Sequence, residues 1–157
     1  IPSKLIMVGE GPERAPAEAL AEELGIASQV IFLGNSNEID KVLCFSDLFL
    51  LPSKAESFGL AALEAMSHGV PVISSNAGGL SEVNTHGVSG FLSEVGAVEE
   101  MAKNALVILK SDAELAQFKK QARTQAQHFA IENIVPMYEE VYEKAIRKNE
   151  PKKASLS

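Results

Sequence analysis

Glu56 and Glu64 are the pair of residues in this chain whose types and spacing suggest chemistry. Seven residues separate them, and Phe58 and Gly59 follow the first carboxylate. Carboxylates accept hydrogen bonds from hydroxyl pairs such as those of a sugar. At the start of a helix, the amides of Phe58, Gly59 and Leu60 would accept an anion such as a phosphate. Because Gly59 has no side chain, a ligand could approach the backbone closely.

The elements around this pair are predicted from apolar runs. Residues 48–51 (LFLL) form a continuous apolar run followed by Pro52, which predicts a buried parallel strand that ends in a loop. Glu56 would lie on that loop, and Glu64 about 7.5 Å further along the axis of the next helix, at 1.5 Å per residue. In open α/β sheets this edge is where ligands bind.

An ordinary explanation exists for Glu64 as well. It is the only charge in residues 58–66, and an isolated glutamate is rarely buried. Glu64 could therefore be a solvent-facing residue of an amphipathic helix. The combination of two carboxylates, a Phe-Gly pair and a preceding strand favours a ligand site instead.

The same stretch resembles a family signature. Two glutamates with seven residues between them, and Phe-Gly after the first, are typical of the retaining nucleotide-sugar glycosyltransferases of family 4, which have the GT-B fold. The resemblance covers nearly the whole chain. It includes residues 9–13, 32–34, 47, 69–72, 78–79, 82 and 87–92.

This resemblance implies roles for individual residues. Glu56, Phe58 and Gly59 would contact the donor sugar, the amides of Gly59 and Leu60 the diphosphate, and Glu64 the ribose. The wall of the pocket is expected from strand-end loops, at Gly9, Gly11, Gly34, Asn35, Gly78 and Gly79. For Gly78 and Gly79, followed by Glu82, a purely structural turn is an equal alternative.

The resemblance also implies a larger enzyme with a UDP-sugar as the expected donor. In such enzymes an Arg and a Lys that bind the diphosphate precede the segment at which this chain starts, and an N-terminal domain binds the acceptor. We therefore expect the donor-binding half of a hexosyltransferase or N-acetylhexosaminyltransferase, inactive alone and with no certain catalytic residue of its own. Residues 73–83 and 89–96 are most similar to the bacterial N-acetylglucosaminyl-malate synthases of bacillithiol assembly.

Composition limits the possible partners and compartments. The chain has 157 residues, enough for one domain with a sizeable core. Its net charge of −7 argues against nucleic acid. No apolar run reaches the roughly 18 residues of a membrane helix, so a cytoplasmic protein is expected, although the full enzyme could associate peripherally with a membrane. The single cysteine, Cys44, is interpreted as a small core residue.

Neither a metal nor a cofactor is expected. His86 and His128 have no metal-ligating neighbours at suitable spacing, and no Asp-x-Asp pair occurs. His68 precedes Gly69 and is interpreted as a cap at a helix end. Residues 9–14 partly match the dinucleotide fingerprint, but Arg14 replaces its third glycine, which argues against nicotinamide or flavin binding.

Strands alternate with helices along the chain, which predicts an α/β fold with a doubly wound parallel sheet, Rossmann-like, and additional C-terminal helices. One domain is expected over residues 1–148 and a polar, disordered tail over 149–157. Strands are expected at 5–8, 30–33, 48–51, 70–74 and 90–93, and helices at 12–25, 38–46, 59–68, 98–109, 112–129 and 131–147, with a tight turn at 76–79 that leads to residues 80–83.

Two rival functions stay open. A sugar-nucleotide epimerase would use a similar cleft but would turn over without an acceptor. A non-catalytic switch domain of the receiver type would need an aspartate at the end of a central strand. Residues 48–51 are instead followed by Pro52 and Ser53.

Overall fold

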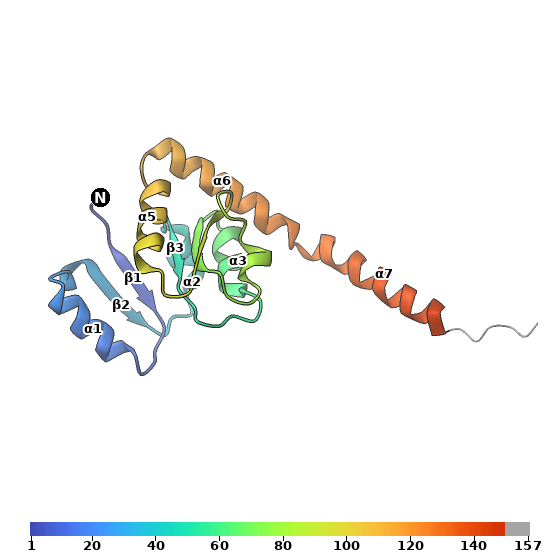
Figure 1. The fold of residues 1–157 in the computed structure, drawn as a ribbon, viewed down its shortest axis with the longest axis horizontal. Coiled ribbons are helices and arrows are strands. Elements are labelled where there is room, and N and C mark those ends of the chain that lie inside the picture. The colour runs from blue at the N-terminus through green and yellow to red at the C-terminus, as the bar shows by residue number, and fades with distance from the viewer. Residues whose placement is uncertain (150–157) are drawn as a thin grey trace, which may run out of the picture. The chain divides into compact units, whose positions relative to one another are not determined.

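The computed structural model describes residues 1–149, and the expected tail over residues 149–157 falls almost wholly outside them. The chain divides into two compact units, residues 1–45 and residues from 46 onward, which are described separately. Both units alternate strands with helices (Figure 1).

The first unit is a two-stranded parallel sheet with its connecting helices. Strand β1 (Leu5–Val8) is followed by α1 (Arg14–Glu23), a short 3-10 turn η1 (Ala27–Gln29), β2 (Val30–Gly34) and α2 (Ile39–Cys44). Leu5 lies opposite Val30 and Met7 opposite Phe32 in the parallel register. The two strands therefore end at the same edge, where the loops containing Gly9 and Gly34 begin.

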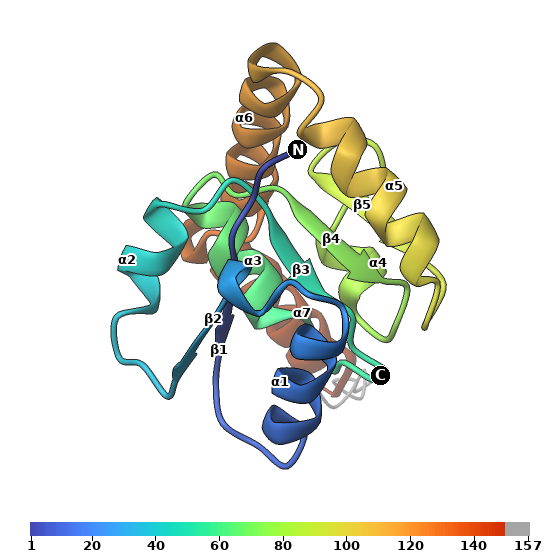
Figure 2. The ribbon, with the colours of Figure 1, turned by 90° about the vertical axis from the view of Figure 1, so that its left-hand side faces the viewer.

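The second unit contains a three-stranded parallel sheet in the order β3-β4-β5. Its elements are β3 (Phe49–Leu51), α3 (Leu60–Ser67), β4 (Val72–Ser75), α4 (Leu80–Val83), β5 (Gly90–Ser93), α5 (Val98–Ile108), α6 (Asp112–His128) and α7 (Ile131–Asn149). Helix α3 contacts β3 and β4, and α5 contacts β4 and β5. Figure 2 shows these two helices on either side of the sheet.

The core of the second unit lies around the central strand β4, whose four residues are all buried. Ile73 of β4 packs with Met101 and Ile108 of α5 and with Phe118 of α6. Ser111 is the N-cap of helix α6, because its hydroxyl accepts a hydrogen bond from the Glu114 amide at 3.2 Å. The site-bearing loops therefore extend from a sheet held by buried apolar packing.

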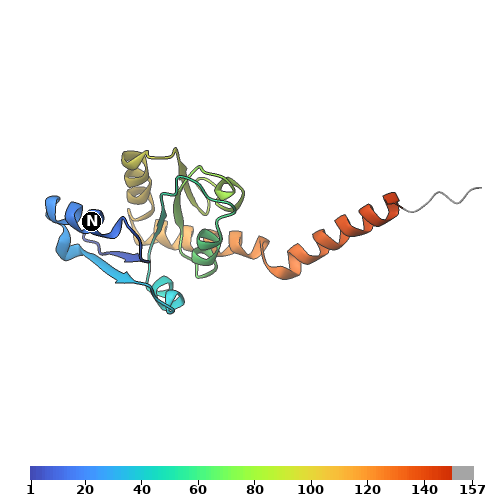
Figure 3. The ribbon, with the colours of Figure 1, turned by 90° about the horizontal axis from the view of Figure 1, so that it is seen from below.

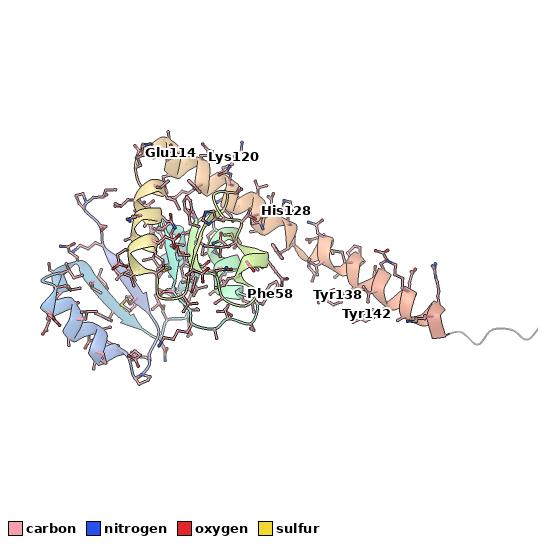
Figure 4. The ribbon with its side chains drawn as sticks, viewed as in Figure 1. Phe58, Glu114, Lys120, His128, Tyr138 and Tyr142 are labelled. Carbon is pink, nitrogen blue, oxygen red and sulfur yellow. The ribbon has the colours of Figure 1, made fainter. Side chains whose placement is uncertain are left out.

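Helix α7 extends away from the sheet and helices of its own unit (Figure 3). Its exposed apolar residues recur at helical spacing and form one stripe: Ile131, Val135, Tyr138, Val141, Tyr142 and Ile146. The rings of Tyr138 and Tyr142 lie 6.4 Å apart on one side of the helix (Figure 4). Such a stripe is typical of a helix whose apolar face packs against another element.

The sequence predicted the parallel α/β class, the strands β1 to β5 and the six longer helices to within a few residues, but it did not predict η1 or assign α4 as a helix. Two burial predictions were wrong. Cys44 is exposed and its neighbour Leu43 is the buried residue of α2. The β3 run is not fully buried either, since Leu50 is 44% exposed. β3 is an edge strand of its sheet, and the five strands form two hydrogen-bonded sheets rather than one.

Candidate functional site

The loop between β3 and α3 carries Glu56, as expected from the sequence. Glu56 is half-buried, and its Oε1 accepts a hydrogen bond from the Ser57 amide at 3.1 Å. The loop leaves the carboxyl end of β3, which runs parallel to β4. Glu56 thus lies at the sheet edge where α/β proteins bind ligands.

Gly59 forms the turn into α3. Its φ of +100° is in the left-handed region that favours glycine, and its carbonyl accepts the first helical hydrogen bond, from Leu63 at 3.0 Å. No side chain caps this helix start, so the amides of Leu60 and the following residues point out of the helix end. An uncapped helix start with a positive dipole end suits an anion.

Phe58 lies beside this helix start and contacts the far end of α6. Its ring, labelled in Figure 4, meets that of Phe129 edge-on, and the two ring centroids are 6.0 Å apart. Phe129 is the residue that ends α6, so the contact joins the Glu56 loop to the C-terminal helices. Phe58 remains 38% exposed.

Glu64 is exposed on α3, two turns from Phe58. It lines an open groove of about 730 Å³ between α3 and α6, together with Leu60, Arg123, Gln127 and Phe129. This groove therefore contains two of the expected ligand-binding residues, Leu60 and Glu64. The exposed carboxylate of Glu64 is accessible from this groove.

Gly78 and Gly79 form the turn after β4 and lie directly against the Glu56 loop. The Gly79 amide donates to the carbonyl oxygen of Glu56 at 3.4 Å. A Cβ added to Gly79 would lie 2.8 Å from Cα of Phe58. The structure thus brings this turn together with the loop that carries Glu56, while Glu82 is exposed on the short helix α4.

In the first unit, the loops with Gly9 and Gly34 are adjacent. The Gly9 amide donates to the carbonyl oxygen of Gly34 at 2.8 Å. Gly11 and Asn35 belong to the same two loops and are exposed. Four of the six residues expected in the pocket wall therefore gather at one edge of the β1-β2 sheet.

Arg14 is the cation of this edge, and it is already paired. It donates to Glu18 at 2.9 Å and to Glu10, and it lies over the Phe32 ring at 5.9 Å. The hydrogen bond to Glu18 and the charge of Glu10 raise the pKa of Arg14. Its charge is largely balanced by these two carboxylates, so it contributes little net positive charge for a diphosphate.

Three further polar residues of the second unit, His68, Lys54 and Asp47, do not contribute to a ligand site. His68 caps α3, since its Nδ1 lies 3.0 Å from the Glu64 carbonyl oxygen, which confirms the interpretation of a cap. Lys54 is exposed, and Asp47 pairs with Lys119 of α6 at 2.6 Å. Within residues 1–149, no three His, Cys, Asp or Glu side chains form a group that could hold a metal ion. No helix in the same range is long and apolar enough to cross a membrane.

Sequence reasoning missed the part of the site contributed by α6. Arg123 and Gln127 share the groove with Glu64, yet they lie about sixty positions further along the chain. No local pattern marks them, because their place depends on how α6 packs on α3. Ser75, at the end of β4, was also missed, although a hydroxyl at a strand end is a recognisable signal.

Comparisons with known proteins identify the family to which the chain is similar. Residues 2–125 match the family described as glycosyl transferases group 1. Over 148 residues the chain is 40% identical to N-acetyl-alpha-D-glucosaminyl L-malate synthase of Bacillus anthracis, which covers 94% of this chain and 39% of that protein. It is 36% identical to D-inositol 3-phosphate glycosyltransferase of Mycobacterium marinum, over 93% of this chain and 34% of that one. The chain thus spans about two fifths of the length of these relatives or less.

Solved structures with a similar fold include proteins that bind UDP. The Anabaena protein Alr3699/HepE in complex with UDP is 30% identical, with a TM-score of 0.80 over 90% of this chain and 41% of that one. The same protein has been solved with UDP-glucose, at a TM-score of 0.77. Sucrose-phosphate synthase from Thermosynechococcus elongatus is 27% identical, with a TM-score of 0.79 over 92% of this chain and 39% of that one.

Proposed function

Because the chain belongs to the group 1 glycosyl transferases, we propose that it forms the part of such an enzyme that binds a nucleotide-sugar donor. The observation that carries the proposal is the arrangement at the β3-α3 loop. There a half-buried carboxylate, Glu56, precedes an uncapped helix start at Gly59 and Leu60, and Glu64 follows on the same helix. One stretch thus offers acceptors for hydroxyls and donors for phosphate.

We assign the roles as follows. Glu56, with Phe58 and Gly59, binds the donor sugar; the amides of Gly59 and Leu60 bind the diphosphate; Glu64 binds the ribose. UDP is the nucleotide in the Alr3699/HepE complexes, which supports a UDP-sugar here. The helix dipole of α3 would stabilise the charge that develops on the departing diphosphate as the sugar leaves.

The acceptor, on this proposal, is bound by a further part of the full-length enzyme. The Bacillus anthracis relative is more than twice as long as the segment that matches it, which leaves room for a second domain. The apolar stripe of α7 is the surface that such a domain would cover. On this proposal the chain alone transfers no sugar, because the acceptor is bound by that further part of the enzyme.

A donor sugar of the N-acetylglucosamine type is the narrower proposal. Its support is the 40% identity to the Bacillus anthracis synthase over almost the whole chain. The family match favours transfer over epimerisation and over a switch domain.

Calorimetric titration of the full-length enzyme with UDP, UDP-glucose and UDP-N-acetylglucosamine tests the proposal. We expect saturable 1:1 binding of UDP, and tighter or equal binding of one UDP-sugar. Adenosine diphosphate is the control nucleotide. Absence of binding by every uridine nucleotide at millimolar concentration would refute a UDP-sugar site.

A further inference from the structure

Residues of the segment 75–80 contact the Glu56 loop near its start and at residues 56–59. The Ser75 hydroxyl contacts the carbonyl oxygen of Ser53, just after β3. The Gly78-Gly79 turn lies against residues 56–58, and Leu80 packs on Gly59. The turn is itself fixed to the sheet, since the Asn76 amide donates to the Ser93 carbonyl of β5 at 2.7 Å. A segment tied to the sheet thus supports the Glu56 loop.

The two glycines permit this close packing. A Cβ on Gly78 would overlap the carbonyl group of Glu56, and one on Gly79 would lie 2.7 Å from the Ser57 carbonyl oxygen. Both obstructing groups are backbone atoms, so a larger residue could be accommodated only if the Glu56 loop moved. Gly78 also has a φ of +53°, in the left-handed region.

Ser75 supports the same loop from below. Its side chain is buried, and its hydroxyl donates to the carbonyl oxygen of Ser53, with the Leu51 carbonyl oxygen 3.3 Å away. These carbonyls belong to the last residue of β3 and to the start of the loop. The hydroxyl therefore sets the direction in which the chain leaves β3, three residues before Glu56.

We propose that Ser75, Gly78 and Gly79 are positioning residues that hold the Glu56 carboxylate where it meets the sugar of the nucleotide-sugar donor. The inference rests on the proposed function and deepens it. The two glycines then contact the backbone of the Glu56 loop and do not themselves touch the ligand. Their effect on sugar binding passes through Glu56.

Gly78→Ala in the full-length enzyme tests this, with Gly87→Ala as matched control. Gly87 has a φ of +76°, also left-handed, but an added Cβ there meets nothing within 4 Å. Both variants carry the conformational cost of a positive φ, and only Gly78→Ala displaces the loop. We expect Gly78→Ala to lose about tenfold or more in kcat/KM for the UDP-sugar, and Gly87→Ala to stay within about twofold of wild type. Equal losses in the two variants would overturn the proposal.

A double-mutant cycle with Glu56→Gln separates positioning from general damage. If Gly78 acts through Glu56, Gly78→Ala should cost little further in the Glu56→Gln background. A merely structural role predicts the same fractional loss in both backgrounds, which would contradict the inference. Melting temperatures of all variants establish that the protein compared is folded.

Ser75→Ala keeps the proposal testable if Gly78→Ala does not fold. The loss of one hydroxyl should lower kcat/KM for the UDP-sugar about threefold to tenfold. This effect on kcat/KM should disappear in the Glu56→Gln background. An unchanged kcat/KM in Ser75→Ala would remove Ser75 from the set. If the wild-type enzyme binds no uridine nucleotide, the proposed function fails. If the wild-type enzyme binds UDP but Gly78→Ala is unimpaired, only the positioning role fails.

Discussion

The side-chain oxygen of Asn84 accepts a hydrogen bond from the Ser89 hydroxyl at 2.9 Å, entirely within the core of the second unit. The Asn84 amide group lies 3.1 Å from the Val72 carbonyl oxygen and 3.2 Å from that of Phe91. One buried side chain thus links β4, β5 and the loop between α4 and β5. Buried polar groups in this position stabilise a fold only while every partner is present.

Replacing Asn84 should therefore destabilise the protein strongly. We expect Asn84→Ala to lower the free energy of unfolding by about 2–4 kcal/mol, because it leaves several buried acceptors without a donor. Asn84→Asp should cost at least as much, since a carboxylate oxygen would face the carbonyls of Val72 and Phe91. Urea denaturation of the full-length protein measures both.

Asn133→Ala is the control for Asn84. Asn133 is exposed and donates a single hydrogen bond, to the Gln127 carbonyl oxygen at 2.8 Å. Its loss should cost less than about 1 kcal/mol. Comparable effects of the two alanine substitutions would mean that the buried network contributes no more than a surface hydrogen bond.

The second prediction concerns metal ions. On the proposed function, the start of α3 offers backbone amides and a helix dipole to the diphosphate, and the Arg and Lys that the family resemblance implies would supply further positive charge, so we expect no divalent cation to be required. We expect sugar transfer by the full-length enzyme to persist, within about twofold, after exhaustive treatment with EDTA. Loss of activity that added Mg²⁺ or Mn²⁺ restores would show that the helix start does not suffice.

The third prediction tests the apolar stripe of α7. Val141 is 60% exposed in this chain, and a covering domain would bury it. Val141→Lys should then lower the free energy of unfolding of the full-length protein by about 2–3 kcal/mol, through lost apolar burial and a desolvated charge. Lysine has the higher helix propensity, so the helix alone would not be weakened.

Glu140→Lys is the matched control, because Glu140 lies on the face of α7 opposite the apolar stripe, at about 100° per residue. It removes only an exposed ion pair with Lys144, so it should change stability by less than about 1 kcal/mol. Equal effects of the two substitutions, or none from Val141→Lys, would mean that no part of the protein covers the stripe.

The sequence predicted the local elements well because their signals are local. The apolar runs that predict β3 and β4 act within a few positions, and these two strands lie where expected. The burial of Cys44 was wrong because α2 has only six residues, fewer than two turns, over which the apolar face is poorly defined.

Contacts between distant segments could not be predicted. The sequence placed the Gly78-Gly79 turn at the same sheet edge as the Glu56 loop, but it did not reveal the direct backbone contact between the two. The same holds for Arg123 and Gln127, which reach the groove of Glu64 through the packing of α6 on α3. These relationships depend on tertiary packing, for which a single sequence has no periodic signal.

The last prediction separates the two carboxylates. Glu64 is proposed to bind the ribose, which is part of UDP itself, whereas Glu56 is proposed to bind the sugar that UDP lacks. Glu64→Gln in the full-length enzyme should weaken UDP binding about tenfold to a hundredfold, the range expected for a charge-assisted hydrogen bond. Glu56→Gln should leave the Kd for UDP within about threefold of wild type and lower turnover of the UDP-sugar by a similar tenfold to hundredfold.

Titration of both variants with UDP, and steady-state kinetics with the UDP-sugar, give the answer. Glu99→Gln is the control, because Glu99 is an exposed carboxylate in the first turn of α5. It should change neither quantity. If Glu64→Gln binds UDP as well as wild type does, Glu64 is a solvated surface residue and the groove it shares with Arg123 is not the ribose site. If Glu56→Gln loses UDP as severely as Glu64→Gln, the two carboxylates contact the same part of the nucleotide and the assigned roles are wrong.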